Sequence, residues 1–332
     1  MIIYIRFYAY RFRMVRPALV LPPEPDERWQ LAKQMGVTDA VIHPLEIGDD
    51  KTTWTYDELR GLRNWLDDAD LNFSVLEGSV PLTDRVRLGL DGRDEDIDEF
   101  KQFLRACGDL GIAVVCYDWM AGVRWARTEA HIESRGGSYV TGYDNEKMQG
   151  GPTVPASERT HEEIFEALAY FLEEVVPVAE EANVKLGLHP DDPPRESVRG
   201  VPRVANSVEN YERILNVVDS EHNGVTFCQG NFAAMGADIP AAIRQFGERI
   251  NFVHFRDVEG DANRFVETWH DDGPTDMHAA MAAYEEAVDS DVPMRPDHVP
   301  TMAGEDNSNP GYHTKGRLFA IGYMRGLLDS VA

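Results

Sequence analysis

The chain has 332 residues, and its 58 aspartates and glutamates outnumber its 32 lysines and arginines, which gives a formal net charge of −26. Hydrophobic residues make up 43% of the sequence, so the chain is neither disordered nor fibrous. The negative charge argues against nucleic acid and anionic membranes as partners, because both need a basic surface. This length is enough for one large domain or two ordinary ones.

Only six of the basic residues are lysines. An acid excess with few lysines is typical of a salt-adapted cytoplasmic protein, whose carboxylate-rich surface stays hydrated in strong salt. We therefore expect a halophilic, cytoplasmic protein; an ordinary acidic enzyme is the alternative. Three cysteines imply no disulfide framework, and no apolar run approaches the roughly 20 residues that span a bilayer.

The first 13 residues, MIIYIRFYAYRFR, are basic and aromatic, unlike the sequence that follows. Arginines break the apolar run and a small-residue cleavage site is missing, so the segment does not resemble a signal peptide. From Met14 onward, MVRPALV has the pattern of a first strand. We therefore predict that residues 1–13 are an N-terminal extension outside the fold and that residues 14–332 form a single domain.

Short apolar segments alternate with longer amphipathic ones along residues 14–332, which is the pattern of a parallel sheet with crossover helices. The predicted strands are 17–21, 39–44, 72–78, 112–118, 184–190, 224–230, 250–257 and 292–297. The predicted helices are 26–35, 55–69, 94–110, 161–183, 207–218, 238–248, 275–288 and 314–330. Asp94 is a predicted N-cap, and Thr160 with Glu163 forms a predicted capping box.

Eight strands, each followed by a helix, are most simply arranged as an α/β protein of the (β/α)8 TIM-barrel type. A doubly wound open sheet is the alternative, but it usually has a glycine-rich switch point, which we do not find. The connection at about 119–160 is too long for a plain loop. It follows a strand end and would therefore lie on the active-site face, so we expect a lid there rather than a disordered insertion.

Metal-ligand residue types stand at the carboxyl ends of four consecutive predicted strands, namely His189, Cys228, His254 and Asp297. In a barrel these ends meet around the axis and carry the active site. Two imidazoles, a thiolate and a carboxylate hold a divalent transition ion with positions open for substrate. Singly, His254 is compatible with a core histidine and Cys228 with a small buried apolar residue. Together the four favour a metal site.

The segments around these positions form a recognisable set. They are HPDDPP (189–194), FCQGNF (227–232), FVHFRD (252–257), an E-x2-H-x2-G-x2-DM run ending at Asp276 and Met277, and RPDH (295–298), with VCYDWMAGVRWART (115–128) as a looser match. From about residue 85 to the C-terminus, the chain resembles the D-mannonate dehydratases. The resemblance implies a xylose-isomerase-like barrel that binds Mn²⁺, or otherwise Fe²⁺, Co²⁺ or Ni²⁺, through the same four ligands. It further implies catalytic roles for His298 and Tyr312.

The implied reaction is removal of water from a sugar acid, D-mannonate or a related aldonate, to give a 2-keto-3-deoxy-aldonate in hexuronate catabolism. A base must take the C2 proton while an acid protonates the departing C3 hydroxyl, and a metal chelating the carboxylate spreads the developing charge. We assign proton abstraction to Tyr312 and protonation of the leaving group to His298. The reverse assignment stays open, because a metal shifts both acidities.

An anionic substrate needs positive charge in the pocket besides the metal. Arg256, just beyond its strand's end, is our first candidate for a carboxylate contact, and Arg127 is our second. The alternative for Arg256 is a rim salt bridge to Asp257 or Glu259.

Other polar residues beside the predicted ligands have two interpretations each. Asn231 and Gln229 would bind substrate hydroxyls, or else be solvated loop residues. Asp191 and Asp192 would bind the free nitrogen of a ligating histidine, or HPDDPP is only a rigid turn.

Departures from the family pattern lie in substrate-facing loops: Asp118-Trp119 replaces Asn-Phe, and Val299-Pro300 replaces Gly-Arg after RPDH. They bear on which sugar acid is used more than on the reaction class. A metal-dependent sugar isomerase or epimerase of the same superfamily, or a non-catalytic metal-binding barrel, are the alternative functions. The thiolate ligand and the His298–Tyr312 pair favour the dehydratase, for which we expect a homo-oligomer with a small-molecule sugar acid as its partner.

Overall fold

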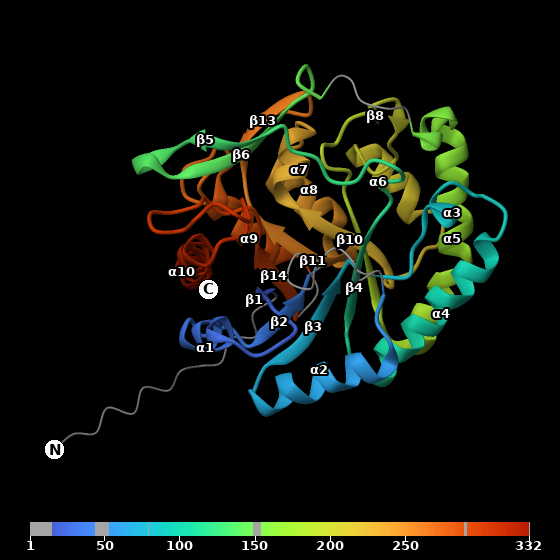
Figure 1. The fold of residues 1–332 in the computed structure, drawn as a ribbon, viewed down its shortest axis with the longest axis horizontal. Helices are drawn as coiled ribbons and strands as arrows, with labels where there is room; N and C mark the ends of the chain where they lie inside the picture. Colours follow the sequence, from blue (N-terminus) through green and yellow to red (C-terminus); the bar gives the residue numbers. More distant parts are fainter. Residues whose placement is uncertain (1–14, 44–52, 79, 149–153, 289–290, 332) are drawn as a thin grey trace.

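A computed structural model of the chain describes residues 15–43, 53–78, 80–148, 154–288 and 291–331. Within this part, eight parallel strands close into a barrel in the order β1-β14-β11-β10-β7-β4-β3-β2 (Figure 1). The strands are β1 (Val15–Leu21), β2 (Asp39–Ile42), β3 (Asn72–Glu77), β4 (Val114–Asp118), β7 (Lys185–His189), β10 (Asn223–Cys228), β11 (Ile250–Phe255) and β14 (Val292–Pro296). The predicted TIM barrel is confirmed, whereas the extension predicted for residues 1–13 lies outside the described residues.

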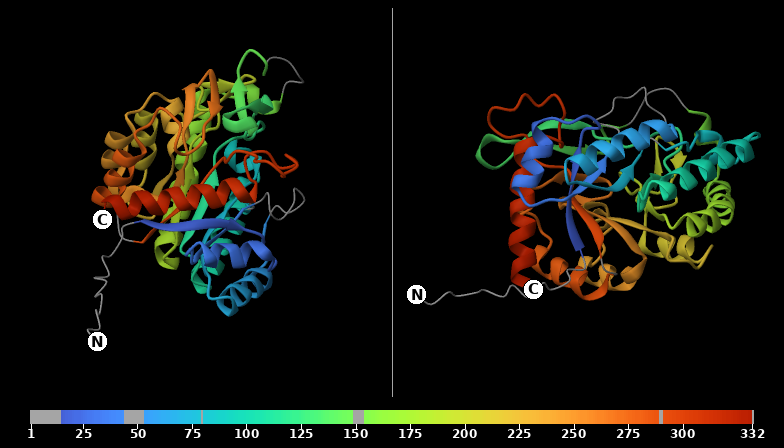
Figure 2. Two further views of the ribbon diagram at one scale, coloured as in Figure 1. Left: turned by 90° about the vertical axis from the view of Figure 1, so that its left-hand side faces the viewer. Right: turned by 90° about the horizontal axis from the view of Figure 1, so that it is seen from below.

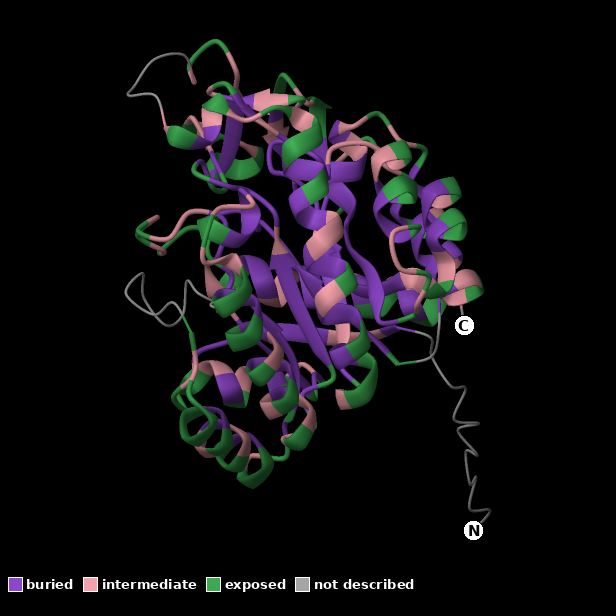
Figure 3. Ribbon diagram, turned by 90° about the vertical axis from the view of Figure 1, so that its right-hand side faces the viewer, coloured by how far each residue is buried: buried purple, intermediate pink, exposed green. Residues whose placement is uncertain are grey.

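Helices surround the barrel and expose their outer faces, while the strands are buried along their length (Figure 3). They are α1 (Glu27–Gln34), α2 (Tyr56–Asp68), α4 (Arg93–Asp109), α5 (His161–Ala182), α6 (Val208–Leu215), α8 (Ile239–Phe246), α9 (Met277–Ala287) and α10 (Thr314–Val331), with short α3 (Asp84–Arg87) and α7 (Gln229–Ala234). The last helix, α10, packs against β1, β14 and α9 and completes the ring (Figure 2). No helix among the described residues is long and apolar enough to cross a membrane.

Two predicted helix caps have different outcomes. The capping box of Thr160 and Glu163 is present at the start of α5. Asp94 is not an N-cap, because α4 begins one residue earlier, after Gly92 in a left-handed conformation. Asp94 instead lies in the first turn, where a carboxylate stabilises the positive end of the helix dipole and accepts a hydrogen bond from the Tyr170 hydroxyl at 3.0 Å.

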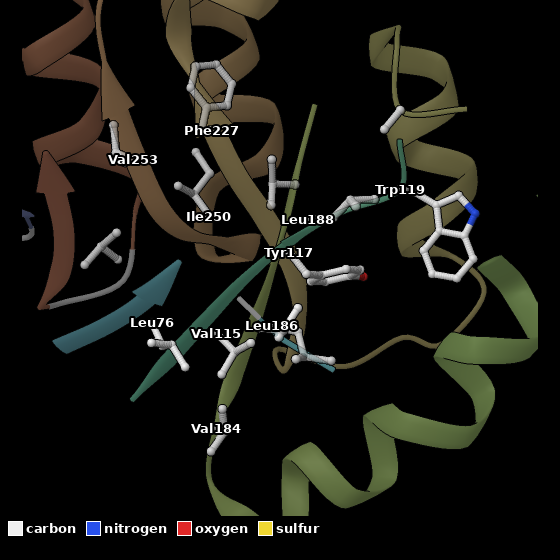
Figure 4. Close-up of a cluster of buried hydrophobic side chains, with 14 of the residues drawn as sticks. Leu76, Val115, Tyr117, Trp119, Val184, Leu186, Leu188, Phe227, Ile250 and Val253 are labelled. Carbon is white, nitrogen blue, oxygen red and sulfur yellow. The ribbon is translucent and has the colours of Figure 1, made fainter. Parts of the chain in front are cut away.

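Successive side chains of each strand point to opposite faces of the barrel sheet, so the hydrophobic core has two parts. Outward side chains pack under the helices in one large cluster, part of which, including Tyr117, Leu188 and Phe227, is shown in Figure 4. Inward side chains form a smaller cluster inside the barrel, with Val20, Val75 and Phe252 among its members. Filling the interior in this way leaves the carboxyl ends of the strands to carry polar groups.

The insertion at 119–160 contains strands β5 (Glu129–Glu133) and β6 (Tyr139–Asp144). They join the hairpin β12 (Val258–Asp261) and β13 (Arg264–Glu267), which follows β11, in an antiparallel sheet of order β12-β13-β6-β5 (Figure 1). Tyr139 also bridges Thr301, after β14. A disordered insertion is therefore excluded for its described residues, and its role as a lid stays a prediction.

Candidate active site

The four predicted metal ligands converge at the carboxyl end of the barrel. Ligand atoms of His189, Cys228 and His254 all lie within 4.8 Å of one another. The Cys228 thiol donates a hydrogen bond to Asp297 Oδ2 over 3.8 Å, and His254 Nδ1 lies 3.7 Å from the same oxygen. The strand register explains this convergence, because Cys228 on β10 stands directly beside His254 on β11.

The chemistry of these donors fits a divalent transition ion. His189 Nδ1 donates to the Pro190 carbonyl over 2.7 Å, so its proton is on that nitrogen and the Nε2 lone pair is available. Burial lowers the pKa of His189 to about 4, which keeps the ring neutral. The buried His254 Nε2 has no hydrogen-bond partner among the described residues and lies 3.3 Å from Glu77 Oε1. Burial also raises the pKa of the Cys228 thiol, so the thiolate form requires a nearby cation.

A second group of ligand types consists of Glu77, Cys116 and His254 and shares His254 with the first. Both oxygens of Glu77 are bound by Arg295, at 2.6 Å and 2.8 Å. Burial alone would raise the pKa of Glu77, but Arg295 beside it holds that pKa well below its usual range. The Cys116 sulfur accepts a hydrogen bond from the Thr226 hydroxyl at 3.2 Å. Asp297 also has guanidinium partners, Arg256 and Arg295, so this pairing does not separate the two groups. The first group is the candidate metal centre because each of its residues is the last residue of a strand or lies next to it, where a barrel carries its active site, whereas Cys116 lies within β4.

Arg256 lies beside the candidate metal centre and is 1% exposed. Its Nη1 is 3.1 Å from Asp297 Oδ2 and 3.3 Å from Asp192 Oδ2, and its Nε is 3.5 Å from Glu267 Oε2. The alternative of a rim salt bridge to Asp257 or Glu259 is wrong for the described residues. The side chain turns inward, because three buried carboxylates face it there.

Arg127 enters the same network from the insertion. Its Nη1 donates to Asp192 Oδ1 at 2.6 Å, and its Nη2 donates to Glu267 Oε1 at 2.7 Å. Burial would raise the pKa of Asp192, but Arg127 and Arg256 hold it far below the usual range. Two arginines and two shared carboxylates therefore form a buried ionic cluster beside the metal centre.

The aspartates of HPDDPP do not bind the ligating histidines, because the Pro190 carbonyl occupies His189 Nδ1. Asp192 pairs with the two arginines, and Asp191 Oδ2 accepts a hydrogen bond from the Ala205 N–H at 2.8 Å. The prediction that they orient a histidine is wrong in this structure. Instead, Asp191 fixes the turn that follows the strand end.

His298 and Tyr312 face each other next to the metal centre. The Tyr312 hydroxyl lies 3.3 Å from His298 Nε2, which lies 3.7 Å from Asp297 Oδ2. Burial raises the pKa of Tyr312 and lowers the pKa of His298, so the phenol and the imidazole are both uncharged. His298 has a φ of 40°, a left-handed conformation that is costly for a side-chain-bearing residue.

The two polar residues after Cys228, Gln229 and Asn231, make different contacts. Asn231 is fully buried, and its Nδ2 donates to the Asp191 carbonyl at 3.0 Å, while its Oδ1 has no hydrogen-bond partner within the described part of the chain. Gln229 lies 2.8 Å from the Met277 sulfur and accepts a hydrogen bond from the Tyr284 hydroxyl. Because β10 ends at Cys228 and α7 starts there, Gln229 points towards α9. The substrate contact predicted for Gln229 is therefore wrong, and neither residue is a solvated loop residue.

Sequence reasoning missed two aromatic contacts of the His298–Tyr312 pair. The Trp125 ring stacks on His298, with centroids 5.5 Å apart and planes 14° apart, and His43 stacks on Tyr312 with centroids 5.6 Å apart. It also missed Glu77 and Glu267. His43 directly follows β2 and Glu77 ends β3, in the first half of the barrel, whereas the four predicted ligands all belong to its second half. Glu267 is the first residue of the E-x2-H-x2-G-x2-DM run, so this motif could have indicated it as a site residue.

Comparisons with known proteins agree over nearly the whole chain. The model of the D-mannonate dehydratase (UxuA) family matches residues 28–155 and 156–332. A mannonate dehydratase from Enterococcus faecalis is 35% identical, over 89% of this chain and 90% of its own length. The crystal structure of mannonate dehydratase from Streptococcus suis serotype 2 superimposes with a TM-score of 0.87 at 29% identity, covering 96% of this chain and 94% of that one. A xylose isomerase domain protein from Planctomyces limnophilus, with a TM-score of 0.60 at 13% identity over 97% of this chain and 99% of that one, shares the fold alone.

Proposed function

The chain belongs to the D-mannonate dehydratase family and is a hydro-lyase that acts on a sugar acid, and we propose that it converts D-mannonate or a related aldonate into the 2-keto-3-deoxy-aldonate. One observation carries the proposal. The His298–Tyr312 pair lies beside Asp297, whose Oδ2 also faces Cys228 and His254. A candidate acid–base pair and a candidate metal centre thus lie side by side at the carboxyl end of the barrel, the arrangement that a dehydration beside a carboxylate requires.

In the proposed mechanism, His189, Cys228, His254 and Asp297 hold a divalent ion. When bound, this ion would polarise the substrate carboxylate and 2-hydroxyl and disperse the charge that develops as the C2 proton leaves. Arg256 and Arg127, in their buried ionic cluster, would hold the carboxylate end of the substrate beside the metal centre. Asn231 Oδ1, buried without a partner, would accept a hydrogen bond from a substrate hydroxyl.

The uncharged His298–Tyr312 pair supplies the proton transfers. Tyr312 takes the C2 proton while its own hydroxyl proton passes to Nε2 of His298, 3.3 Å away. His298 then gives that proton to the C3 hydroxyl, which leaves as water. The resulting enol loses its hydroxyl proton to solvent and takes up a proton at C3, which gives the 2-keto acid. One proton is therefore relayed from C2 to the leaving group, and no net charge forms in the pocket.

Incubation with D-mannonate and related aldonates, with and without Mn²⁺ and in high salt, tests the function. We expect metal-dependent formation of a 2-keto-3-deoxy acid. Conversion to an isomeric sugar without loss of water would instead identify an isomerase or epimerase. No turnover of any of these substrates with metal present would contradict the proposal.

Steady-state rates of Tyr312→Phe and His298→Asn test the proton relay. Each removes one partner of the relay, so we expect turnover to fall by about 100-fold or more. Tyr170→Phe on α5 and the exposed His278→Asn on α9 are matched controls away from the site and should keep wild-type turnover. Near-wild-type turnover in either site variant would remove that residue from the mechanism.

We further propose Mn²⁺ as the native metal, in a cytoplasmic homo-oligomer that serves hexuronate catabolism. The thiolate in the ligand set also accepts the softer ions Fe²⁺, Co²⁺ and Ni²⁺. Elemental analysis of protein purified without chelators would identify the metal, and sedimentation at several concentrations would give the oligomeric state. A different ion, or a monomer at all concentrations, would contradict the respective part.

A further inference from the structure

The two ring nitrogens of His298 have different surroundings. Nε2 lies 3.3 Å from the Tyr312 hydroxyl and 3.5 Å from Nη2 of Arg127. A guanidinium can only donate hydrogen bonds, and a phenol is a donor as readily as an acceptor. Asp297 Oδ2 also lies 3.7 Å from Nε2, but this oxygen already accepts hydrogen bonds from Arg256 Nη1 at 3.1 Å and from the Cys228 thiol. The two nearer neighbours therefore favour a lone pair on Nε2, which places the ring proton on Nδ1. Among the described residues, the buried Nδ1 has no hydrogen-bond partner.

A carboxylate faces this unpartnered nitrogen. Oε1 of Glu267 lies 4.0 Å from His298 Nδ1, and Glu267 is 3% exposed. Its other oxygen, Oε2, is buried, lies 3.5 Å from Arg256 Nε and has no hydrogen-bond partner among the described residues. His298 Nδ1 is thus a buried donor without a hydrogen bond that faces a carboxylate, and a hydrogen bond between the two groups would offset the free energy that this donor costs.

We propose that Glu267 is a positioning residue that accepts a hydrogen bond from His298 Nδ1 in the working enzyme. The bond would fix the ring with its Nε2 lone pair directed at Tyr312, as a carboxylate does for many functional histidines. This role rests on the proposed function of His298. Closing the distance from 4.0 Å to a hydrogen bond of about 3 Å needs a movement of about 1 Å, which a rotation of the carboxylate about its last, broad torsion supplies.

The position of Glu267 in the fold suits this role. It is the last residue of β13, which pairs with β12 on one side and with β6 of the insertion on the other. Oε1 of Glu267 also accepts a hydrogen bond from Arg127 at 2.7 Å. Release of Arg127 to an anionic substrate would free this oxygen for His298, so substrate binding and histidine orientation would be coupled through one carboxylate.

A purely electrostatic role is the competing explanation, because Glu267 also balances the charges of Arg127 and Arg256. Two variants separate the roles. Glu267→Gln removes the charge and keeps a carbonyl oxygen that can accept a hydrogen bond from Nδ1. Glu267→Leu removes both the charge and the acceptor oxygen, and the leucine side chain is similar in size. Asp192→Asn is the matched control. Asp192 balances the same two arginines, but the carboxylate that faces His298 Nδ1 belongs to Glu267.

The experiment measures kcat and KM of these variants on the metal-loaded enzyme with D-mannonate. We expect kcat of Glu267→Leu to lie about 10- to 100-fold below that of Glu267→Gln, with similar KM values, and Asp192→Asn to change mainly KM. Equal kcat for the Gln and Leu variants would overturn the proposal. Wild-type enzyme that does not dehydrate any aldonate would instead overturn the proposed function.

A second measurement does not depend on turnover. Nitrogen-15 NMR of histidine-labelled protein distinguishes a protonated from an unprotonated ring nitrogen, and His298→Asn identifies the signals. We expect wild-type His298 to carry its proton on Nδ1, and Glu267→Gln to keep that tautomer. If Glu267→Leu does not fold, the tautomer of the wild-type enzyme still decides, because a proton on Nε2 would overturn the proposal.

Discussion

Replacing Gly230 with alanine tests whether Arg256 is held in place by close packing. Gly230 lies in α7, two residues after Cys228, which is a proposed metal ligand. A Cβ at this position would lie 2.4 Å from Nε, 2.9 Å from Cγ and 3.2 Å from Cδ of Arg256. Because favourable contacts lie near 3.5 Å, Arg256 would have to move by about 1 Å. It cannot turn towards solvent, since it is 1% exposed and bound by three carboxylates.

The size of the effect follows from two opposing contributions to the free energy of unfolding. Overpacking a filled interior costs about 1–3 kcal/mol, while Gly→Ala within a helix gains about 0.5–1 kcal/mol. We therefore expect Gly230→Ala to lower the free energy of unfolding by up to about 2.5 kcal/mol. If Arg256 binds the substrate carboxylate, misplacing it by about 1 Å should also lower kcat/KM by about 100-fold.

Urea denaturation in high-salt buffer and steady-state kinetics measure both effects. Gly326→Ala is the matched control, because Gly326 also lies in a helix, α10, and a Cβ there meets nothing within 4 Å. The control should be more stable than wild type by about 0.5–1 kcal/mol and equally active. A Gly230→Ala variant that matches the control in stability and activity would refute the close-packing argument.

Three further predictions concern the metal, a helix cap and the surface charge. Cys228→Ser should weaken binding of Mn²⁺ in a calorimetric titration, and unchanged affinity would count against a thiolate ligand. Thr160→Ala removes the capping box of α5 and should cost about 1 kcal/mol in urea denaturation, whereas Thr160→Ser should not. The net charge of −26 predicts loss of structure or activity in dilute buffer, because salt no longer screens the repulsion between carboxylates; a circular dichroism spectrum and an activity that do not change with salt would contradict it.

The barrel was predictable because burial on both faces leaves a local signal. The stretch DAVI of β2 is fully buried, as expected for a parallel strand between two layers. The helices between the strands have amphipathic periods and caps that are equally local. The insertion gave no such signal. Strand β6 pairs with the nearby β5 on one side and on the other side with β13, more than 100 residues away in the sequence, so this second neighbour could not be inferred from its own residues.

The candidate site shows the same division. The metal-ligand types were found because each stands at a strand end, and a barrel brings strand ends together. The ionic cluster was not found, because Arg127 meets Asp192 and Glu267 across separations of 65 and 140 residues. The sequence does not show that the Arg127 guanidinium has partners, but in the fold the carboxylates of Asp192 and Glu267 already balance its charge. Sequence position predicts which side chains reach the pocket, whereas their pairing depends on packing that is not local.

The sheet that joins the insertion to the β12–β13 hairpin has a consequence for protein engineering and for evolution. Arg127 comes from one of these loops and Glu267 from the other, and the loops are hydrogen-bonded through β6 and β13. Exchanging only one loop between relatives would leave a buried charge without its partner, at a cost that a surface loop would not incur. The two loops therefore depend on each other, and a chimaera designed to accept a new sugar acid should take both loops from the same relative.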